Sequence, residues 1–251
     1  SCISGYLIKR GYQKTNIYRV NQLRNKETND DSSKKIFNES DFIELRNAGA
    51  STISTILLVF YIKKEELLII KKRNQCDFEY KKLYEREFDN YIKIKNPFLP
   101  KFYGITNKNN CLVTEFINGS LLRDIRKLNL TINEKITIIF ELMIIIEFLH
   151  RNNFVYRDLK PNNLIIDLNK TIVLIDFDRM VPYDENSNEE IHTTIFNSFY
   201  AAPEVLKGKF SYASDIYSLG QLIYYILVDS KPNDNSLDIY GDIMQFYDKC
   251  I

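Results

Sequence analysis

Four side chains that can bind a metal ion or a phosphate group lie close together in the middle of the chain. Asp158, Lys160 and Asn163 fall in the segment YRDLKPNN. Two apolar runs follow, LIID and TIVLID, and Asp176 ends the second run and begins DFD. Carboxylate and amide oxygens suit Mg²⁺, and an ammonium group neutralises phosphate charge. The stretch therefore predicts either a site for nucleotide phosphates and magnesium or an ordinary β-hairpin with polar turns.

The apolar pattern around these residues predicts strands first and helices later. The run STISTILLVFYIKKEELLIIKK reads as two β-strands joined by a turn at KKEE, and YKKLYEREFDNYIKI carries apolar residues at helical spacing. We expect a further strand at 111–117, a helix at 134–150 with Asn133 as its N-cap, and a helix across SDIYSLGQLIYYILV. This order favours an α+β chain with two lobes and a hinge near 115–120.

The composition is that of an ordinary globular protein. The 251 residues are 45% hydrophobic and carry a formal net charge of +1, which argues against nucleic acid or a membrane surface as a partner. The longest apolar stretch, 136–149, is short and contains Glu141 and Glu147, so no membrane span is expected. The cysteines show no metal-ligand spacing, and this favours reduced thiols and a cytoplasmic location; they are Cys2, Cys76, Cys111 and Cys250.

Taken in order, the motifs YRDLKPNN, DFD, AAPE and SDIYSLG resemble a eukaryotic-type protein kinase domain over residues 42–251. The resemblance implies a bilobal protein-kinase-like fold. It divides into an N-terminal extension or linker at 1–40, a β-rich N-lobe at 41–116 and a helical C-lobe at 117–251. The last residues read as one late helix where the family has several, so we expect an incomplete C-lobe, either because the chain is truncated or because its C-lobe is reduced.

The resemblance assigns roles to the central cluster. Asp158 is expected to orient the substrate hydroxyl and accept its proton, and Lys160 to neutralise charge on the γ-phosphoryl group. Asn163 and Asp176 are the expected magnesium ligands. Asp178 stands where the family has glycine, and this puts conformational switching in doubt more than metal binding.

A lysine and a glutamate upstream complete the expected catalytic set. By resemblance, Lys71 in LLIIKK contacts the phosphates, with Lys72 as the alternative. Glu87 falls in the predicted helix at the family's position for an ion pair with that lysine. The alternative is that Glu87 is an exposed helical charge. Phe177 is expected to pack behind this helix.

The glycine-rich loop that covers phosphates in the family is degraded in this chain. Its three glycine positions read Gly49, Ser51 and Ser54, and Ile56 is the apolar residue above the nucleotide. Serine has a Cβ and prefers negative φ, so close approach of the backbone to phosphates is expected to be poorer. Read alone, this segment is an ordinary strand pair.

The segment VTEFINGS resembles the hinge that binds adenine. The backbones of Glu115 and Ile117 are expected to contact the adenine edge, with Thr114 as a small gatekeeper. Ile69 occupies the place of a small alanine above the base, so we expect a tight purine slot.

Three residues are expected to have structural roles. Asp215 in SDIYSLG matches the buried aspartate that ties the catalytic-loop backbone to a core helix. Glu204 of AAPE has no evident partner in the sequence, and we expect it to reach solvent or to pair elsewhere. His150 is expected to be a cap or core contact rather than a catalytic base.

Two functional classes follow from the resemblance. The first is an ATP- and Mg²⁺-dependent protein serine/threonine kinase, with the tyrosine-kinase-like branch suggested by FLPKFYGI. Its expected partners are a protein substrate and an upstream kinase that phosphorylates Thr193 or Thr194, and the added phosphate is expected to order the segment by bonding to Arg157. The second is a pseudokinase scaffold, favoured by the degraded loop and Asp178. A small-molecule kinase is disfavoured by AAPE and Asp215.

Overall fold

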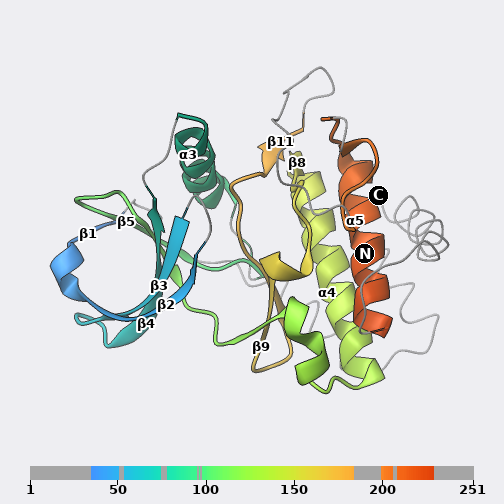
Figure 1. Ribbon diagram of the computed structural model, residues 1–251, viewed down its shortest axis with the longest axis horizontal. Helices are drawn as coiled ribbons and strands as arrows, with labels where there is room; N and C mark the ends of the chain where they lie inside the picture. Colours follow the sequence, from blue (N-terminus) through green and yellow to red (C-terminus); the bar gives the residue numbers. More distant parts are fainter. Residues whose placement is uncertain are drawn as a thin grey trace. The chain divides into compact units, whose positions relative to one another are not determined.

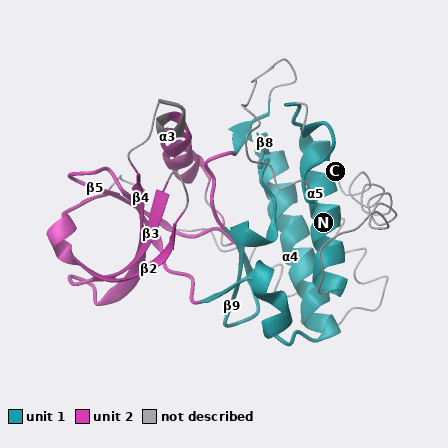
Figure 2. Cartoon of the chain, viewed as in Figure 1, with its two compact units in different colours: residues 1–27, 119–174, 180–251 teal, residues 28–118, 175–179 magenta. Residues whose placement is uncertain are grey.

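The computed structural model describes residues 35–50, 54–74, 78–94, 96, 98–183, 199–205 and 208–228. These residues form two compact units (Figure 2). Unit 2 contains residues 35–118 and 175–179, and unit 1 contains 119–174 and the described part of 180–228. The chain passes from unit 2 to unit 1 between Asn118 and Gly119, inside the predicted hinge.

Unit 2 is built on a six-stranded sheet with the order β1-β5-β6-β4-β3-β2 (Figure 1). The β3–β4 hairpin predicted around KKEE is present, and its turn places Glu65 at a φ of 52°. Strand β6 is shorter than the predicted strand at 111–117, because the chain leaves the sheet after Glu115. The strands are β1 (Lys35–Phe37), β2 (Phe42–Ala50), β3 (Ser54–Tyr61), β4 (Glu66–Arg73), β5 (Phe102–Thr106) and β6 (Leu112–Glu115).

Residues 35–41, most of which the sequence assigns to an extension or linker, belong to this sheet in the structure. Strand β1 pairs in parallel with β5, with Lys35 opposite Gly104, and the one-turn helix η1 (Glu39–Asp41) leads from it into β2. The Glu39 carboxylate accepts hydrogen bonds from the Thr106 hydroxyl and from the backbone and side-chain amides of Asn109, each at 3.1 Å. This segment therefore joins the two edge strands of the sheet, β1 and β2.

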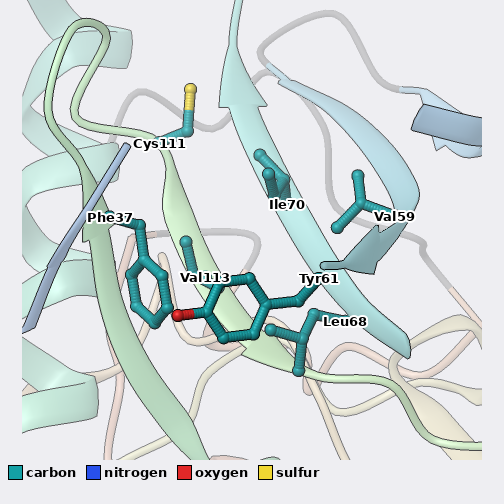
Figure 3. Close-up of a cluster of buried hydrophobic side chains, with 7 residues drawn as sticks. All are labelled: Phe37, Val59, Tyr61, Leu68, Ile70, Cys111 and Val113. Atoms are coloured by element: carbon teal, nitrogen blue, oxygen red, sulfur yellow. The ribbon is translucent and has the colours of Figure 1, made fainter. Parts of the chain in front are cut away.

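A cluster of seven buried side chains fills one face of the sheet (Figure 3). Neighbouring strands contribute alternate residues to it, as the pleat requires. The rings of Phe37 and Tyr61 meet edge to face at 5.3 Å. The members of the cluster are Phe37, Val59, Tyr61, Leu68, Ile70, Cys111 and Val113. The intervening residues of β3 and β4 must then point to the opposite face.

Helix α3 (Phe78–Lys93) confirms the helix predicted from YKKLYEREFDNYIKI. It packs on the sheet through aromatic side chains. The Tyr91 ring stacks on Phe102 of β5 at 5.3 Å, and Phe88 meets the same ring edge to face at 5.8 Å. The Tyr84 hydroxyl accepts a hydrogen bond from the backbone N–H of Leu112 at 2.7 Å. These contacts hold α3 against β5 and β6.

Unit 1 is mainly helical. Helices α4 and α5 pack side by side through buried apolar residues (Figure 1). Unit 1 also contains two small sheets, with the strand orders β10-β9-β7 and β11-β8. The elements are β7 (Gly119–Leu121), η2 (Leu122–Lys127), α4 (Ile132–Arg151), β8 (Phe154–Val155), η3 (Pro161–Asn163), β9 (Leu164–Asp167), β10 (Ile172–Leu174), β11 (Val181–Pro182) and α5 (Tyr212–Val228). The hairpin alternative for LIID and TIVLID is correct as local structure, since β9 and β10 pair antiparallel.

Helix α4 begins earlier than predicted, because Thr131 and not Asn133 is its N-cap. The Thr131 hydroxyl accepts a hydrogen bond from the Glu134 N–H at 3.3 Å, and the Glu134 carboxylate accepts one from the Thr131 N–H at 2.7 Å. This reciprocal pair is a capping box, which satisfies two backbone donors at once. Asn133 lies inside the first turn instead.

The acidic residues that interrupt the apolar face of α4 have partners. The buried Glu141 accepts a hydrogen bond from the backbone N–H of Ile172 at 3.0 Å and so links α4 to β10. Glu147 forms an ion pair with Arg151 one turn later, at 2.7 Å. Within the ranges that the structure describes, no helix has the length and apolar character needed to cross a membrane.

Candidate functional site

Unit 2 contains a buried ion cluster centred on Lys71 of β4. The Lys71 Nζ lies 2.6 Å from Glu87 Oε2 of α3 and 2.8 Å from Asp176 Oδ1. Glu87 is 1% exposed, so it is not the surface charge that the alternative interpretation required. Lys72 is exposed, whereas the Lys71 side chain is 11% exposed and holds both carboxylates. The predicted Lys71–Glu87 ion pair is therefore present.

The charges of this cluster keep Lys71 protonated. Burial by itself lowers the pKa of Lys71, but the negative charges of Asp176, Glu87 and Asp178 outweigh it and hold that pKa well above its ordinary value. Burial raises the pKa of Glu87, and the Lys71 charge opposes this rise. The lysine can thus remain a cation at any physiological pH and present its charge to an anionic ligand.

The DFD segment is anchored to α3. The Asn90 side-chain amide donates a hydrogen bond to the Phe177 carbonyl at 2.8 Å, and the Tyr91 ring meets Phe177 edge to face at 5.1 Å. Phe177 is buried against this helix, as predicted. Asp176 adopts a φ of 69°, a conformation that non-glycine residues rarely take, and Asp178 is buried.

Two residues of α3 that contribute to this arrangement were not singled out from the sequence. Asn90 lies three residues after Glu87 and so shares its helix face. In the sequence, Tyr84 is one of the apolar residues at helical spacing in YKKLYEREFDNYIKI. Its hydroxyl lies 2.7 Å from the carbonyl oxygen of Asn110 and 3.2 Å from that of Lys71. Helical spacing from Glu87 was the signal that could have identified Asn90.

Several predicted nucleotide-binding residues lie on the face of the sheet opposite the hydrophobic cluster. Ile56 pairs across strands with both Gly49 and Lys71, and Ile69 pairs with Thr114. Cross-strand partners and residues two apart on one strand share a face, so the register groups these residues. Ser54 lies two residues before Ile56 in β3 and is buried, and Ser51 lies outside the described residues.

The segment after β6 contains the other expected nucleotide contacts. The Glu115 N–H donates a hydrogen bond to the Lys101 carbonyl at 2.9 Å, so only the Glu115 carbonyl could face an adenine. Ile117 lies two residues beyond the strand and is half-buried. Ile69 lies opposite Thr114 on the same face, and the tight purine slot stays a prediction.

Unit 1 gathers Asp158, Lys160 and Asn163 in one loop. The Lys160 Nζ lies 2.9 and 2.7 Å from the two carboxylate oxygens of Asp158. The Asn163 amide nitrogen donates to the Asp158 carbonyl at 2.9 Å and to its carboxylate at 3.1 Å. Asp158 is 8% exposed and Asn163 is 4% exposed. These hydrogen bonds orient the Asp158 carboxylate and direct the amide nitrogen of Asn163 toward Asp158.

The backbone of this loop is fixed by Asp215 of α5. One Asp215 oxygen accepts a hydrogen bond from the Tyr156 N–H at 2.8 Å and lies 2.9 Å from His150 Nε2, and the other accepts from the Arg157 N–H at 2.9 Å. All four residues are buried. Asp215 therefore ties the loop to a core helix, and His150 is a core contact, both as predicted.

Glu204 of AAPE also has a partner that the sequence did not reveal. The Ser214 hydroxyl donates to its carboxylate at 3.2 Å, and Glu204 is half-buried. This agrees with the expectation that Glu204 pairs elsewhere. Thr193 and Thr194 lie outside the described residues, as does the predicted late helix.

The Lys71 cluster and the Asp158 loop offer different charged groups for chemistry. The Lys71 cluster offers a fixed cation beside carboxylates, and the Asp158 loop offers an oriented carboxylate beside a second cation. In the described part of the chain, no three or more His, Cys, Asp or Glu side chains form a candidate metal site. A magnesium ion needs fewer, because it is usually held by one or two carboxylates together with water and phosphate oxygens.

Most of the chain is similar in sequence to protein kinases. A sequence model of the protein kinase domain matches residues 42–249. The chain is 29% identical over 176 residues to spermatocyte protein spe-8 of Caenorhabditis briggsae, covering 68% of this chain and 34% of that protein. It is 27% identical over 172 residues to an Aurora kinase of Debaryomyces hansenii, covering 66% and 42%. For the SNF1-like protein kinase ssp2 of Schizosaccharomyces pombe, identity is 33% over 158 residues, covering 60% and 27%. The chain therefore spans less than half the length of each of these relatives.

Proposed function

The chain belongs to the protein kinase domain family, and on that premise we propose that it is an ATP-dependent protein serine/threonine kinase. It transfers the γ-phosphoryl group of ATP to a hydroxyl group of a protein substrate. Phosphoryl transfer depends mainly on positioning and charge compensation. The geometry of the described residues supports both.

The observation that carries this proposal is the buried ion cluster of Lys71. The ammonium group is held at 2.6 Å by Glu87 and at 2.8 Å by Asp176, so its position is determined from two sides. In the proposed function, Lys71 contacts the α- and β-phosphates. A lysine fixed in this way adds positive charge at a defined point without reorganisation during the reaction.

Asp158 and Lys160 carry the chemistry at the hydroxyl. Asp158 orients the substrate hydroxyl and accepts its proton, because its carboxylate is already oriented by Lys160 and Asn163. Lys160 offsets the negative charge of the γ-phosphoryl group. The loop backbone behind Asp158 is held by Asp215, and this limits the motion of the carboxylate.

Asn163 and Asp176 are the residues that would hold magnesium. Asn163 donates to Asp158 through its amide nitrogen, which leaves the oxygen end of the amide as its metal-binding atom. The Asp176 side chain is 35% exposed, so its carboxylate is accessible to an ion. These residues would place positive charge close to the phosphate groups, which is the chemistry that magnesium would supply. Oxygen donors of this kind fit magnesium.

Nucleotide binding is assigned to one face of the sheet in unit 2. Gly49 and Ile56 would cover the nucleotide together with Ser51 and Ser54, and the hinge residues Thr114, Glu115 and Ile117 would contact adenine. The strand register places Gly49, Ile56 and Thr114 on the same face of the sheet as Lys71, which supports this assignment.

An upstream kinase acting on Thr193 or Thr194 is part of the proposal. Its basis is Arg157, a cation next to Asp158 in the loop, since phosphate groups form strong charge-assisted bonds with arginine. Full activity of a Thr193→Ala/Thr194→Ala double variant would contradict this part. The free, buried Cys111 fits a reducing compartment, and we propose the cytoplasm.

The test of the main proposal is phosphate transfer from Mg-ATP to a mixed Ser/Thr/Tyr peptide library. Three variants run beside the wild type: Lys71→Met, its neighbour Lys72→Met as the matched control, and Asp158→Asn. We expect transfer to serine and threonine to fall by about 10²–10³ in Lys71→Met and Asp158→Asn and to persist in Lys72→Met.

The outcomes separate the candidate functions. Transfer by the wild type that is equally strong in Asp158→Asn would point to a contaminating kinase. Bound nucleotide without any transfer, repeated in a longer chain, would favour the pseudokinase scaffold. Phosphate appearing on a small metabolite instead of a peptide would favour the small-molecule kinase. Labelled tyrosine in place of serine and threonine would refute the proposed specificity.

A further inference from the structure

Arg157, the residue before Asp158, is held in an unusual conformation. Its φ is 74°, in the left-handed region of backbone conformation that residues with a Cβ rarely adopt. The residue is 6% exposed. Such a conformation is strained and persists only where the surroundings enforce it. The Asp215 carboxylate enforces it on one side by accepting the Arg157 N–H at 2.9 Å.

A second contact acts on the side chain of the same residue. The guanidinium carbon of Arg157 lies 3.9 Å from the centroid of the Phe210 ring. A cation over the face of an aromatic ring is attracted by the ring's electron distribution, and the attraction is strongest where water is excluded. Arg157 is buried and Phe210 is half-buried, so this contact is largely shielded from water.

Phe210 and Asp215 belong to one continuous segment of the chain. Phe210 lies two residues before Tyr212, where α5 begins, and Asp215 lies in the first turn of that helix. The segment therefore contacts Arg157 twice, through a ring on the guanidinium group and through a carboxylate on the backbone N–H. Together the two contacts fix both ends of Arg157.

From this geometry we propose that Phe210 is a positioning residue for Asp158. By stacking on Arg157, the ring keeps the strained backbone in the conformation that aims the next residue, Asp158, at the substrate hydroxyl. This inference rests on the proposed kinase function, since it concerns the orientation of the proposed base. A misplacement of about 1 Å can lower the rate of an oriented reaction by about 10²-fold.

The test replaces the ring while keeping an apolar side chain. In Phe210→Leu, we expect kcat for peptide phosphorylation to fall about tenfold with KM for ATP within about twofold, because binding groups are unchanged. Phe210→Tyr keeps an aromatic face and should retain kcat near the wild-type value. Rescue by tyrosine but not by leucine distinguishes stacking on the cation from simple packing.

A double-variant cycle with Arg157→Met makes the assignment specific. In the Arg157→Met background the ring has no cation to hold, so Phe210→Leu should then change kcat by less than about twofold. Independent, multiplying effects of the two substitutions would overturn the proposal. So would a Phe210→Leu variant with wild-type kcat.

Amide hydrogen exchange provides a readout that needs no catalysis. The N–H groups of Tyr156 and Arg157, both bonded to Asp215, should exchange about tenfold faster in Phe210→Leu than in the wild type or Phe210→Tyr. If the wild type transfers no phosphate, the kinase function fails, but this measurement still decides whether Phe210 orders the loop. Unchanged exchange at both amides would refute the positioning role.

Discussion

Gly104 in β5 is the position where an added methyl group should be most damaging to unit 2. Its φ is 144°, and a Cβ built on its backbone would lie 1.9 Å from the carbonyl oxygen and 2.8 Å from the carbonyl carbon of Lys35. Real Cβ atoms essentially never lie within 3.0 Å of such a neighbouring atom. Because Lys35 contributes backbone atoms here, no change of rotamer can relieve the collision. In Gly104→Ala, strand β1 must therefore move away from β5.

The free-energy cost can be estimated from two parts. Placing alanine at this φ costs about 1–3 kcal/mol. Displacing β1 also removes Phe37, which is 2% exposed, from the hydrophobic cluster, and burial of a phenylalanine side chain contributes about 1.5–3 kcal/mol. We expect Gly104→Ala to lower the free energy of unfolding by roughly 3–5 kcal/mol.

Guanidinium chloride unfolding followed by circular dichroism measures this loss, and Gly208→Ala is the matched control. Gly208 also has a positive φ, 76°, but an added Cβ there meets no atom within 4 Å. Its replacement should cost only the conformational part, about 1–2 kcal/mol. Hydrogen exchange then assigns the change, because the amides of 35–41 should lose protection in Gly104→Ala and keep it in Gly208→Ala.

Equal destabilisation by the two substitutions would refute the reasoning, since it would mean that β1 does not approach β5 at Gly104. A Phe37→Ala background adds a further check. If Gly104→Ala acts by expelling β1, the two substitutions share one effect, and their combined cost should be less than the sum of the single costs. Additive costs would contradict the proposed displacement.

Three further predictions concern unit 1. Asp215→Asn should lower the free energy of unfolding by roughly 1.5–3 kcal/mol, because an amide offers one acceptor oxygen where the carboxylate now serves two backbone N–H groups; denaturant unfolding measures it, and a change below ~0.5 kcal/mol would contradict it. Thr131→Ala should cost about 1 kcal/mol as the loss of an N-cap, whereas Asn133→Ala should stay within about 0.5 kcal/mol in the same assay; the reverse order would restore Asn133 as the cap. Hydrogen bonds from the backbone and side chain of Thr131 hold the pKa of Glu134 below its ordinary value of 4.5. The stabilisation of the fold by the ionised Glu134 is therefore complete above that value and is lost as the pH falls through the lower, folded-state pKa. The difference in unfolding free energy between wild type and Thr131→Ala should shrink between pH 7 and pH 3, and a constant difference would refute this link.

Much of the local structure could be predicted from the sequence. Periodicity depends on residues a few positions apart, so the β3–β4 hairpin and the helices α3, α4 and α5 follow from apolar spacing alone. The N-cap of α4 is also readable, because Thr131 and Glu134 have the spacing of a capping box, and the prediction of Asn133 as the cap is wrong.

The candidate site was predictable where a motif is contiguous or its spacing is regular. Asp158, Lys160 and Asn163 lie in one loop, and local hydrogen bonds bring them together. Lys71 and Glu87 were paired by resemblance to a family pattern, and the structure contains that ion pair. Asp215, which supports the loop backbone, follows from the same resemblance, whereas no local pattern pairs Phe210 with Arg157.

What the sequence by itself determined is the set of elements and the types of side chain available for chemistry, because both depend on short-range pattern and composition. The tertiary structure alone decided which distant residues meet. It placed Lys35 against Gly104, the Tyr84 hydroxyl beside Leu112, and the Phe210 ring on Arg157. These contacts join residues far apart in the chain, and burial and backbone geometry select them only when the whole unit folds.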